Sequence, residues 1–292
     1  MSGKGTYYLP PPSYWPITGS IAMFCIFFGA GNWLHNKWWG PWLFTLGISI
    51  LIFMLFGWFG TVIKENKMGL LDDPQVDLSF RWGMCWFIFS EIMFFATFFG
   101  ALFFIRVLSV PRLGGAGTGL MTHILNFPNF IAQWPLLKNP DNIKFVAPKS
   151  VMYAWNLPAI NTAVLLTSSI TVTIAHWGLL KNKRWQAILF QAITALLGLS
   201  FLSLQAKEYT EAYLDKGLTL GSGAFGSTFF ILTGFHALHV TLGTIMLTVV
   251  LVRICKRHFD PPHSYFSFEA VSWYWHFVDV VWLFLFVLVY WI

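Results

Sequence analysis

The uncharged run GAFGSTFFILTGFHALHVTLGTIMLTVVLV, residues 223–252, decides the fold class of this chain. It contains no Asp, Glu, Lys or Arg and exceeds the run of about 20 apolar residues that an α-helix needs to cross a bilayer. A membrane β-strand needs only about 10 residues and alternates apolar with polar side chains. The length and continuity of the run therefore predict a membrane-spanning α-helix.

Six further apolar runs lie along the chain, and together the runs predict an all-helical integral membrane protein, a bundle of seven transmembrane helices. Tryptophans such as Trp33, Trp82 and Trp185 mark several ends, as expected for the aromatic belt at a membrane interface. Because no internal repeat or low-complexity linker is visible, we expect one membrane domain, residues 1–292. The predicted spans are residues 17–33, 39–63, 82–105, 157–180, 185–206, 223–252 and 270–292.

The longest connection, about residues 106–156, is predicted to lie outside the membrane or at its interface. It contains an uncharged stretch, residues 113–137, that is similar to a span in composition. Clustered glycines and two prolines, Pro128 and Pro135, interrupt this stretch and disfavour a continuous helix. We therefore interpret it as an excursion from the membrane.

Composition and charge exclude several classes of protein. Hydrophobic residues make up 57% of the chain and charged residues 10%, whereas an ordinary soluble domain is about 25% charged. The net charge of +6 comes from basic residues in connectors between apolar runs, which reflects topology, so we expect no nucleic-acid binding. Cys25, Cys85 and Cys255 are far apart, which argues against a zinc or iron–sulfur site.

The distribution of Lys and Arg predicts the orientation of the chain. Basic residues cluster in the connections at residues 64–81, 181–184 and 253–257, which all lie on the side of the N-terminus. The short connections on the other side carry fewer of them. By the positive-inside rule we expect the N-terminus in the cytoplasm and the C-terminus outside, with no removable signal peptide in residues 1–16.

Glu91 is the sharpest case of a polar residue inside a span, because a charge at the centre of a membrane helix costs about 2.5–3.5 kcal/mol. Its neighbours at helical spacing, Phe87, Phe94 and Phe95, offer no compensating charge. Glu91 is either a proton-linked or structurally decisive carboxyl, or a neutral acid that ties two helices together by a hydrogen bond. The candidate partners on other spans are, in order, His239, His236 and His176.

Two further polar pairs lie within predicted spans at a spacing of three residues. His276 and Asp279 share one face of the last span, as either a local pair or a contact with a neighbouring subunit. His236 and His239 could begin a metal site, but a third ligand would be needed, so we favour hydrogen bonds to helix neighbours and expect no metal. No phosphate loop, nucleophile elbow or other catalytic motif is visible, so no catalytic residue is predicted.

Six short segments follow one another in a distinctive order along the chain. They are WPITG (15–19), SEIMFF (90–95), GSTFF (226–230), TGFHALHVTLG (233–243), FEA (268–270) and WYWHFVDVVW (273–282). These segments resemble subunit III of haem–copper cytochrome c oxidase, and the likeness covers nearly the whole chain. Two departures stand out: residues 116–155 have no counterpart in the shorter members, and Gly60 stands where an arginine can occur.

The resemblance implies a role for the chain as well as a fold. Members of the family are accessory subunits whose helices 1–2 are separated from helices 3–7 by a lipid-filled cleft. They carry no haem or copper, which the partner subunits hold, and they bind phospholipid. Their main contact is subunit I, and subunit II belongs to the same complex. The family supports proton uptake by an enzyme that oxidises cytochrome c, reduces oxygen to water and pumps protons.

The resemblance also implies a location and an enzyme class. The chain is expected to be a non-redox component of an oxidoreductase and translocase, with no catalytic centre of its own. We expect it in an energy-transducing membrane. The additional segment, residues 116–155, favours a bacterial inner membrane, with the C-terminus in the periplasm.

Trp58 and Arg253 are the candidate lipid-binding residues. Trp58 shortly precedes Lys64 at the inner end of the second span, and Arg253 follows the sixth span, so both are expected at similar depth. Arginine offers a planar donor fork for a phosphate, and tryptophan favours the headgroup boundary. The family pattern also places lipid there. The alternative is two ordinary interfacial anchors.

Two other functions compete with this interpretation. Subunit III of a related quinol oxidase resembles the same family but usually lacks the first two spans, and the strong run at residues 39–63 argues against it. An independent transporter would be expected to show inverted repeats and broken helices near the membrane midplane. Neither is visible in this sequence.

Overall fold

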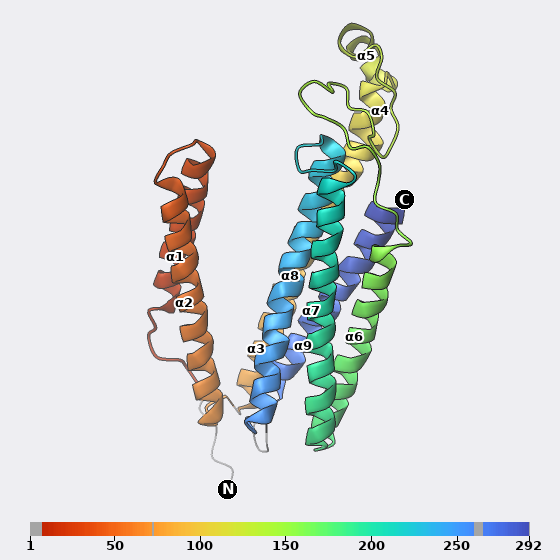
Figure 1. The fold of residues 1–292 in the computed structure, drawn as a ribbon. Helices are drawn as coiled ribbons and strands as arrows, with labels where there is room; N and C mark the ends of the chain where they lie inside the picture. Colours follow the sequence, from red (N-terminus) through yellow and green to blue (C-terminus); the bar gives the residue numbers. More distant parts are fainter. Residues whose placement is uncertain (1–7, 72, 260–264, 292) are drawn as a thin grey trace. The chain divides into compact units, whose positions relative to one another are not determined.

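The computed structural model describes residues 8–71, 73–259 and 265–291, and over these residues every regular element is a helix (Figure 1). Seven helices in the described ranges are long and apolar enough to span a membrane, which confirms the predicted all-helical membrane fold. The chain divides into two compact units, Met1–Arg81 with His258–Tyr265, and Trp82–Arg257 with Phe266–Ile292. The expectation that residues 1–292 form one domain stays a prediction.

The first unit contains a tight helical hairpin of α1 (Trp15–Leu34) and α2 (Gly40–Lys67). Glycine allows the two backbones to approach closely, as is common between membrane helices. A Cβ atom on Gly29 would lie 2.4 Å from the backbone nitrogen of Phe44. A Cβ atom on Gly47 would likewise lie 2.7 Å from a backbone nitrogen of α1. The contact between α1 and α2 therefore depends on the absence of side chains at these positions.

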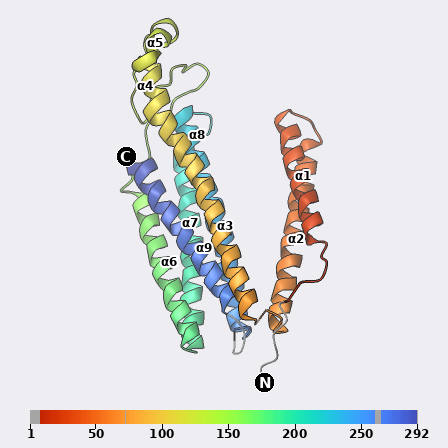
Figure 2. The same cartoon turned by 180° about the vertical axis from the view of Figure 1, so that it is seen from behind.

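The second unit is a bundle of long helices, in which α3 runs along α8 (Figure 2). Helices α6 and α7 pack against each other, α8 packs on α7, and α9 contacts both α6 and α8. The large aromatic side chains Phe201, Trp275 and Trp282 are fully buried in its core. The helices that build the bundle are α3 (Pro74–Phe103) from Trp82 onward, α6 (Leu157–Leu180), α7 (Arg184–Leu214), α8 (Ala224–Cys255) and α9 (Phe266–Leu285), which continues into η3 (Phe286–Trp291).

The helix that contains the third predicted span is longer than that span. Helix α3 continues through the π-helical turn η1 (Phe104–Ser109) into α4 (Val110–Leu113), so one helical run covers Pro74–Leu113, 40 residues. At 1.5 Å per residue this run is about 60 Å long, roughly twice the hydrocarbon thickness of a bilayer. The prediction of a loop beginning at residue 106 was therefore wrong, because a charged residue ends a membrane span without ending the helix.

The connection after Leu113 is partly ordered by helices of its own, η2 (Gly117–Gly119) and α5 (Leu120–Asn126). These short helices form no eighth candidate span, in agreement with the prediction that residues 113–137 are not a continuous helix. Asn139 fastens the later part of the connection to the bundle, because its Nδ2 donates to the carbonyl oxygens of Phe145 (2.8 Å) and Ser222 (3.1 Å).

The fifth span also extends beyond its predicted end. Helix α7 reaches Leu214, whereas the apolar run predicts an end at residue 206, before the charged Lys207. Glu208 therefore lies within the helix, and its side chain is fully buried. Burial of this carboxyl depends on neighbours from other parts of the chain, which the local sequence does not show.

Candidate functional site

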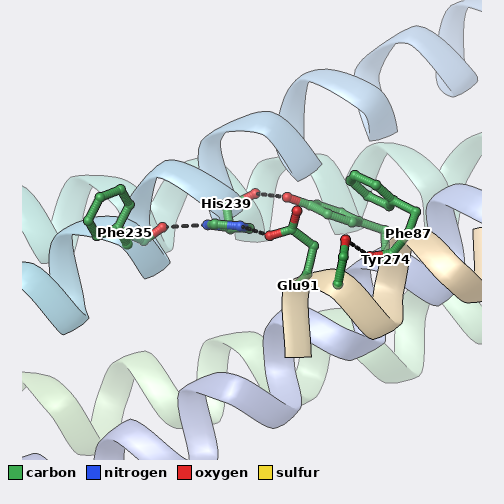
Figure 3. A network of polar contacts seen from close by, with 6 residues as sticks. Phe87, Glu91, Phe235, His239 and Tyr274 are labelled. Atoms are coloured by element: carbon green, nitrogen blue, oxygen red, sulfur yellow. Dashed lines mark hydrogen bonds and ion pairs between the residues drawn. The ribbon is translucent and has the colours of Figure 1, made fainter. Parts of the chain in front are cut away.

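The polar contact between Glu91 and His239 joins α3 to α8 (Figure 3). The carboxyl oxygen Oε2 of Glu91 lies 2.8 Å from Nε2 of His239, so the structure brings together Glu91 and its first candidate partner. The other imidazole nitrogen, Nδ1, lies 2.7 Å from the carbonyl oxygen of Phe235, one turn earlier on α8. Both nitrogens of the ring are thus engaged.

The partners of the ring determine where its hydrogens lie. The Phe235 carbonyl can only accept, so Nδ1 of His239 must carry a hydrogen and donate it. In a neutral imidazole Nε2 then has a lone pair and must accept, which requires a protonated Glu91 as donor. The alternative is an imidazolium beside a carboxylate. In either case one proton is shared between Glu91 and His239.

Aromatic rings surround this pair. Phe95 lies edge-on to the His239 ring at 4.9 Å between centroids, and Phe94 lies at 5.9 Å. The Tyr274 hydroxyl of α9 donates to the His239 carbonyl oxygen at 3.4 Å. The side chain of Glu91 keeps 22% of its surface exposed, against 9% for His239. The Glu91 carboxyl therefore lies at the edge of the second unit. The rings that surround the pair are apolar.

The other two candidate partners of Glu91 make different contacts. His236 is fully buried, and its Nε2 donates to the Val278 carbonyl oxygen at 3.2 Å. His176 stacks on Phe268 at 5.4 Å between centroids, and its Nε2 lies 3.6 Å from a carboxyl oxygen of Glu269. Glu269 belongs to the FEA segment, residues 268–270, but nothing in the sequence indicates that it would contact His176.

The structure connects His276 and Asp279 through a third residue, Ser169 of α6. The Ser169 hydroxyl lies 3.0 Å from Nδ1 of His276 and donates to Oδ2 of Asp279. Next to them, Nε1 of Trp275 donates to the Ser168 hydroxyl at 2.8 Å. These contacts fasten α9 to α6. Single serines in an apolar helix carry no signal that would have identified them from the sequence.

The two candidate lipid-binding residues belong to different units. Trp58 in the first unit is 46% exposed, as an interfacial side chain would be. Arg253 in the second unit is 6% exposed, and its Nη1 donates to the Ser267 hydroxyl at 2.6 Å. Arg253 therefore makes an internal contact as well, and lipid binding at both residues stays a prediction.

A further buried group was missed by the sequence analysis. Gln205 and Glu208 of α7 and Tyr290 of η3 are almost or fully buried side chains in the interior of the second unit. Glu208 was missed because the predicted span ended before it, and Tyr290 because a tyrosine near a span end is ordinary.

None of these contacts assembles a metal centre. Among the described residues, no group of three or more His, Cys, Asp and Glu side chains could hold a metal ion. The chemistry available is the donation, acceptance and sharing of protons between buried side chains. The fold and these contacts define a multi-pass helical membrane protein whose spans are tied together by polar pairs.

Comparisons with known proteins identify the family. A family profile described as Cytochrome c oxidase subunit III matches residues 5–292. Proteins named cytochrome c oxidase subunit 3 are similar over most of their length. Those of Cyprinus carpio and Danio rerio are 41% and 40% identical over 270 residues, which cover 92% of this chain and 90% of each relative. That of Struthio camelus is 39% identical over 271 residues, 93% of this chain and 91% of the relative.

The chain therefore belongs to the cytochrome c oxidase subunit III family, as its sequence motifs predict. It is a multi-pass membrane subunit of a multi-subunit oxidoreductase complex.

Proposed function

We propose that this chain is the accessory, non-redox subunit III of a proton-pumping cytochrome c oxidase. Its main partner is subunit I, which it stabilises, and subunit II belongs to the same complex. Haem and copper lie in those partners. The observation that carries the proposal is the Glu91–His239 pair, in which one proton is shared at the edge of the bundle. Such a group suits a subunit that supports proton uptake without any electron transfer of its own.

Phospholipid binding forms a second part of the proposal. In this part of the proposal the chain binds phospholipid, with Trp58 and Arg253 near the headgroups on the inner side of the membrane. Support comes from the exposure of Trp58 and from the guanidinium of Arg253, whose planar fork suits a phosphate.

The proposed location is an energy-transducing membrane, with the N-terminus on its inner side. The support is the concentration of Lys and Arg in the connections at residues 64–81, 181–184 and 253–257. The prediction of a bacterial inner membrane depended on the additional segment, and the animal relatives lend it no support.

The proposed function is tested in the purified oxidase complex by replacing Glu91. With Glu91→Ala, we expect unchanged haem spectra and an almost unchanged initial rate, but fewer turnovers before activity is lost and slower proton uptake. Ser90→Ala is a matched control, since this exposed hydroxyl only donates to the Phe87 carbonyl of its own helix. The same number of turnovers before activity is lost, and the same rate of proton uptake, in the Glu91→Ala and Ser90→Ala complexes would contradict the proposed role of the pair.

A further inference from the structure

Gln205, Glu208 and Tyr290 form a buried polar cluster away from the Glu91–His239 pair. Gln205 and Glu208 lie one turn apart on α7 and are 3% and 0% exposed. Tyr290, on η3, is 9% exposed, and its hydroxyl lies within interaction range of the Glu208 carboxyl and the Gln205 amide. Three polar side chains from two elements therefore meet inside the bundle.

Asn161 of α6 lies at the same level as this cluster. The hydroxyls of Thr171 and Thr194 are 2.8 Å apart, which sets the register of the antiparallel helices α6 and α7. Counting ten residues back from Thr171 and ten forward from Thr194 brings Asn161 level with Leu204, next to Gln205. Asn161 is 0% exposed and shares the buried face of α6 with Leu165 and Ser168. Asn161 therefore lies on the buried face of α6 at the level of the cluster.

The polar atoms of these four residues have no hydrogen-bond partner among the described protein groups. This holds for both amide atoms of Asn161, both amide atoms of Gln205, both carboxyl oxygens of Glu208 and the hydroxyl of Tyr290. The Tyr290 hydroxyl approaches Glu208 and Gln205 closely enough to interact with both, although neither contact reaches full hydrogen-bond geometry. Native proteins rarely leave so many buried polar atoms unsatisfied, so a bound molecule is expected between them.

The mixture of donors and acceptors identifies the class of that molecule. The amide NH₂ groups of Asn161 and Gln205 donate only, whereas the carboxyl and amide oxygens accept. A bare cation would satisfy the oxygens but would leave both NH₂ groups without an acceptor. Water donates and accepts, and buried waters typically bind such groups.

The local helix geometry is consistent with a built site. Tyr290 lies in the π-helical turn η3, Phe286–Trp291, which follows directly on α9. A π-helical turn is rare and occurs frequently at functional sites. Here the turn carries the Tyr290 side chain into the bundle, where its ring packs on Phe229 at 5.5 Å between centroids.

We propose that Asn161, Gln205, Glu208 and Tyr290 form an internal water-binding site between α6, α7 and η3. Bound water links the Glu208 carboxyl to the Asn161 amide and the Tyr290 hydroxyl. This site is independent of the role proposed for Glu91 and His239, and it gives the buried Glu208 carboxyl a hydrogen-bonded environment.

Infrared spectroscopy of the purified oxidase complex tests this site. Spectra of the parent and of Asn161→Leu are recorded in ordinary water and in oxygen-18 water, and the O–H stretching region is compared. We expect bands that shift with oxygen-18 in the parent and are missing from Asn161→Leu. Glu208→Gln, which keeps the volume of the side chain, should retain the bands at shifted positions.

Thr194→Val is the matched control, because the Thr194 hydroxyl is also buried between α6 and α7 but bonds directly to Thr171 and to the Phe190 carbonyl. It should leave the oxygen-18-sensitive bands of the parent unchanged. The proposal is overturned if the parent shows no oxygen-18-sensitive band that Asn161→Leu removes. It is also overturned if exchanging sodium for potassium changes the thermal stability of the parent but not of Glu208→Gln, since the site would then hold a cation.

Discussion

At the scale of single residues, the structure explains how a carboxyl is tolerated in an apolar span. Glu91 has no cationic side chain among its helical neighbours, but it contacts the imidazole of His239 on α8. The other nitrogen of this imidazole donates a hydrogen bond to the Phe235 carbonyl oxygen. In such apolar surroundings, the desolvation penalty disfavours an ion pair of an imidazolium and a carboxylate. We therefore expect the shared proton to reside on Glu91, with a neutral His239.

The hydrogen bond from Glu91 predicts different effects for two substitutions. In Glu91→Gln the amide NH₂ can still donate to Nε2 of His239, so we expect less than about 1 kcal/mol of destabilisation. Glu91→Ala leaves the imidazole nitrogen without a partner and should cost about 1–3 kcal/mol. The measurement is the midpoint of unfolding of this subunit in the detergent-solubilised complex. Equal midpoints for the two variants would show that the hydrogen bond contributes little.

At the scale of elements, Arg184 caps the C-terminus of α8. Its Nε and Nη2 donate to the carbonyl oxygens of Ile254 (3.3 Å) and Cys255 (2.5 Å), in the last turn of that helix. A cation there satisfies free carbonyl groups and interacts favourably with the helix dipole. We expect Arg184→Ala to destabilise the bundle by about 0.5–2 kcal/mol, measured by denaturant unfolding. Lys183→Ala, at the adjacent exposed position, should have almost no effect, and a similar loss in both variants would argue against a specific cap.

The hairpin of α1 and α2 predicts a steric effect of a single methyl group. In Gly29→Ala the new Cβ atom would lie 2.4 Å from the Phe44 backbone nitrogen, so the helices must separate. Overpacking of this kind costs about 1–3 kcal/mol. Gly31→Ala is the control on the same helix, since nothing lies within 4 Å of its Cβ position. We expect the Gly29 variant alone to weaken retention of this subunit during purification of the complex. Equal retention of both variants would show that this close approach is not needed.

The existence of the membrane helices could be predicted, because it depends on composition. The ends of two of them could not, because these depend on contacts with distant residues. Continuous apolar runs suffice to predict seven spans, because length and hydropathy alone decide membrane insertion. The ends of α3 and α7 lie beyond the predicted ones, because Arg106 and Lys207 end the apolar runs without ending the helices. Glu208 is fully buried, and its carboxyl interacts with Tyr290, which is distant in the sequence. Similarly, Ser169 becomes important only through its contacts with His276 and Asp279.

The additional segment, residues 116–155, shows the same limit. The uncharged stretch with which it overlaps, residues 113–137, indicates neither a helix nor a loop by its composition, and the structure of the segment depends on distant contacts. Nδ2 of Asn139 donates to the Ser222 carbonyl, and Trp134 packs edge-on against Phe225 at 5.5 Å. Gly223 completes this contact, because its φ is +85° and a Cβ atom there would lie 2.5 Å from the Asn139 amide oxygen.

At the scale of the whole molecule, the polar contacts connect helices to one another, and the described residues assemble no metal cluster. The proposed accessory role requires that the chain contributes to the enzyme through the subunits that it contacts. We expect the purified chain alone to show no haem absorption and no oxidation of cytochrome c. A complex depleted of the chain should keep its haem and copper spectra but lose activity during turnover. Redox activity of the isolated chain, once contaminating metals are excluded, would contradict this account.

The central claim is that Glu91 and His239 share one proton that resides on the carboxyl. It is tested most directly by the infrared difference spectrum between the parent complex and Glu91→Gln at neutral pH. The subtraction removes the contributions of Glu208 and Asp279, which both complexes retain. The account predicts that the variant lacks a C=O stretching band of a neutral carboxylic acid. Loss of carboxylate and imidazolium bands in its place would show that the two residues form an ion pair, and would contradict the claim.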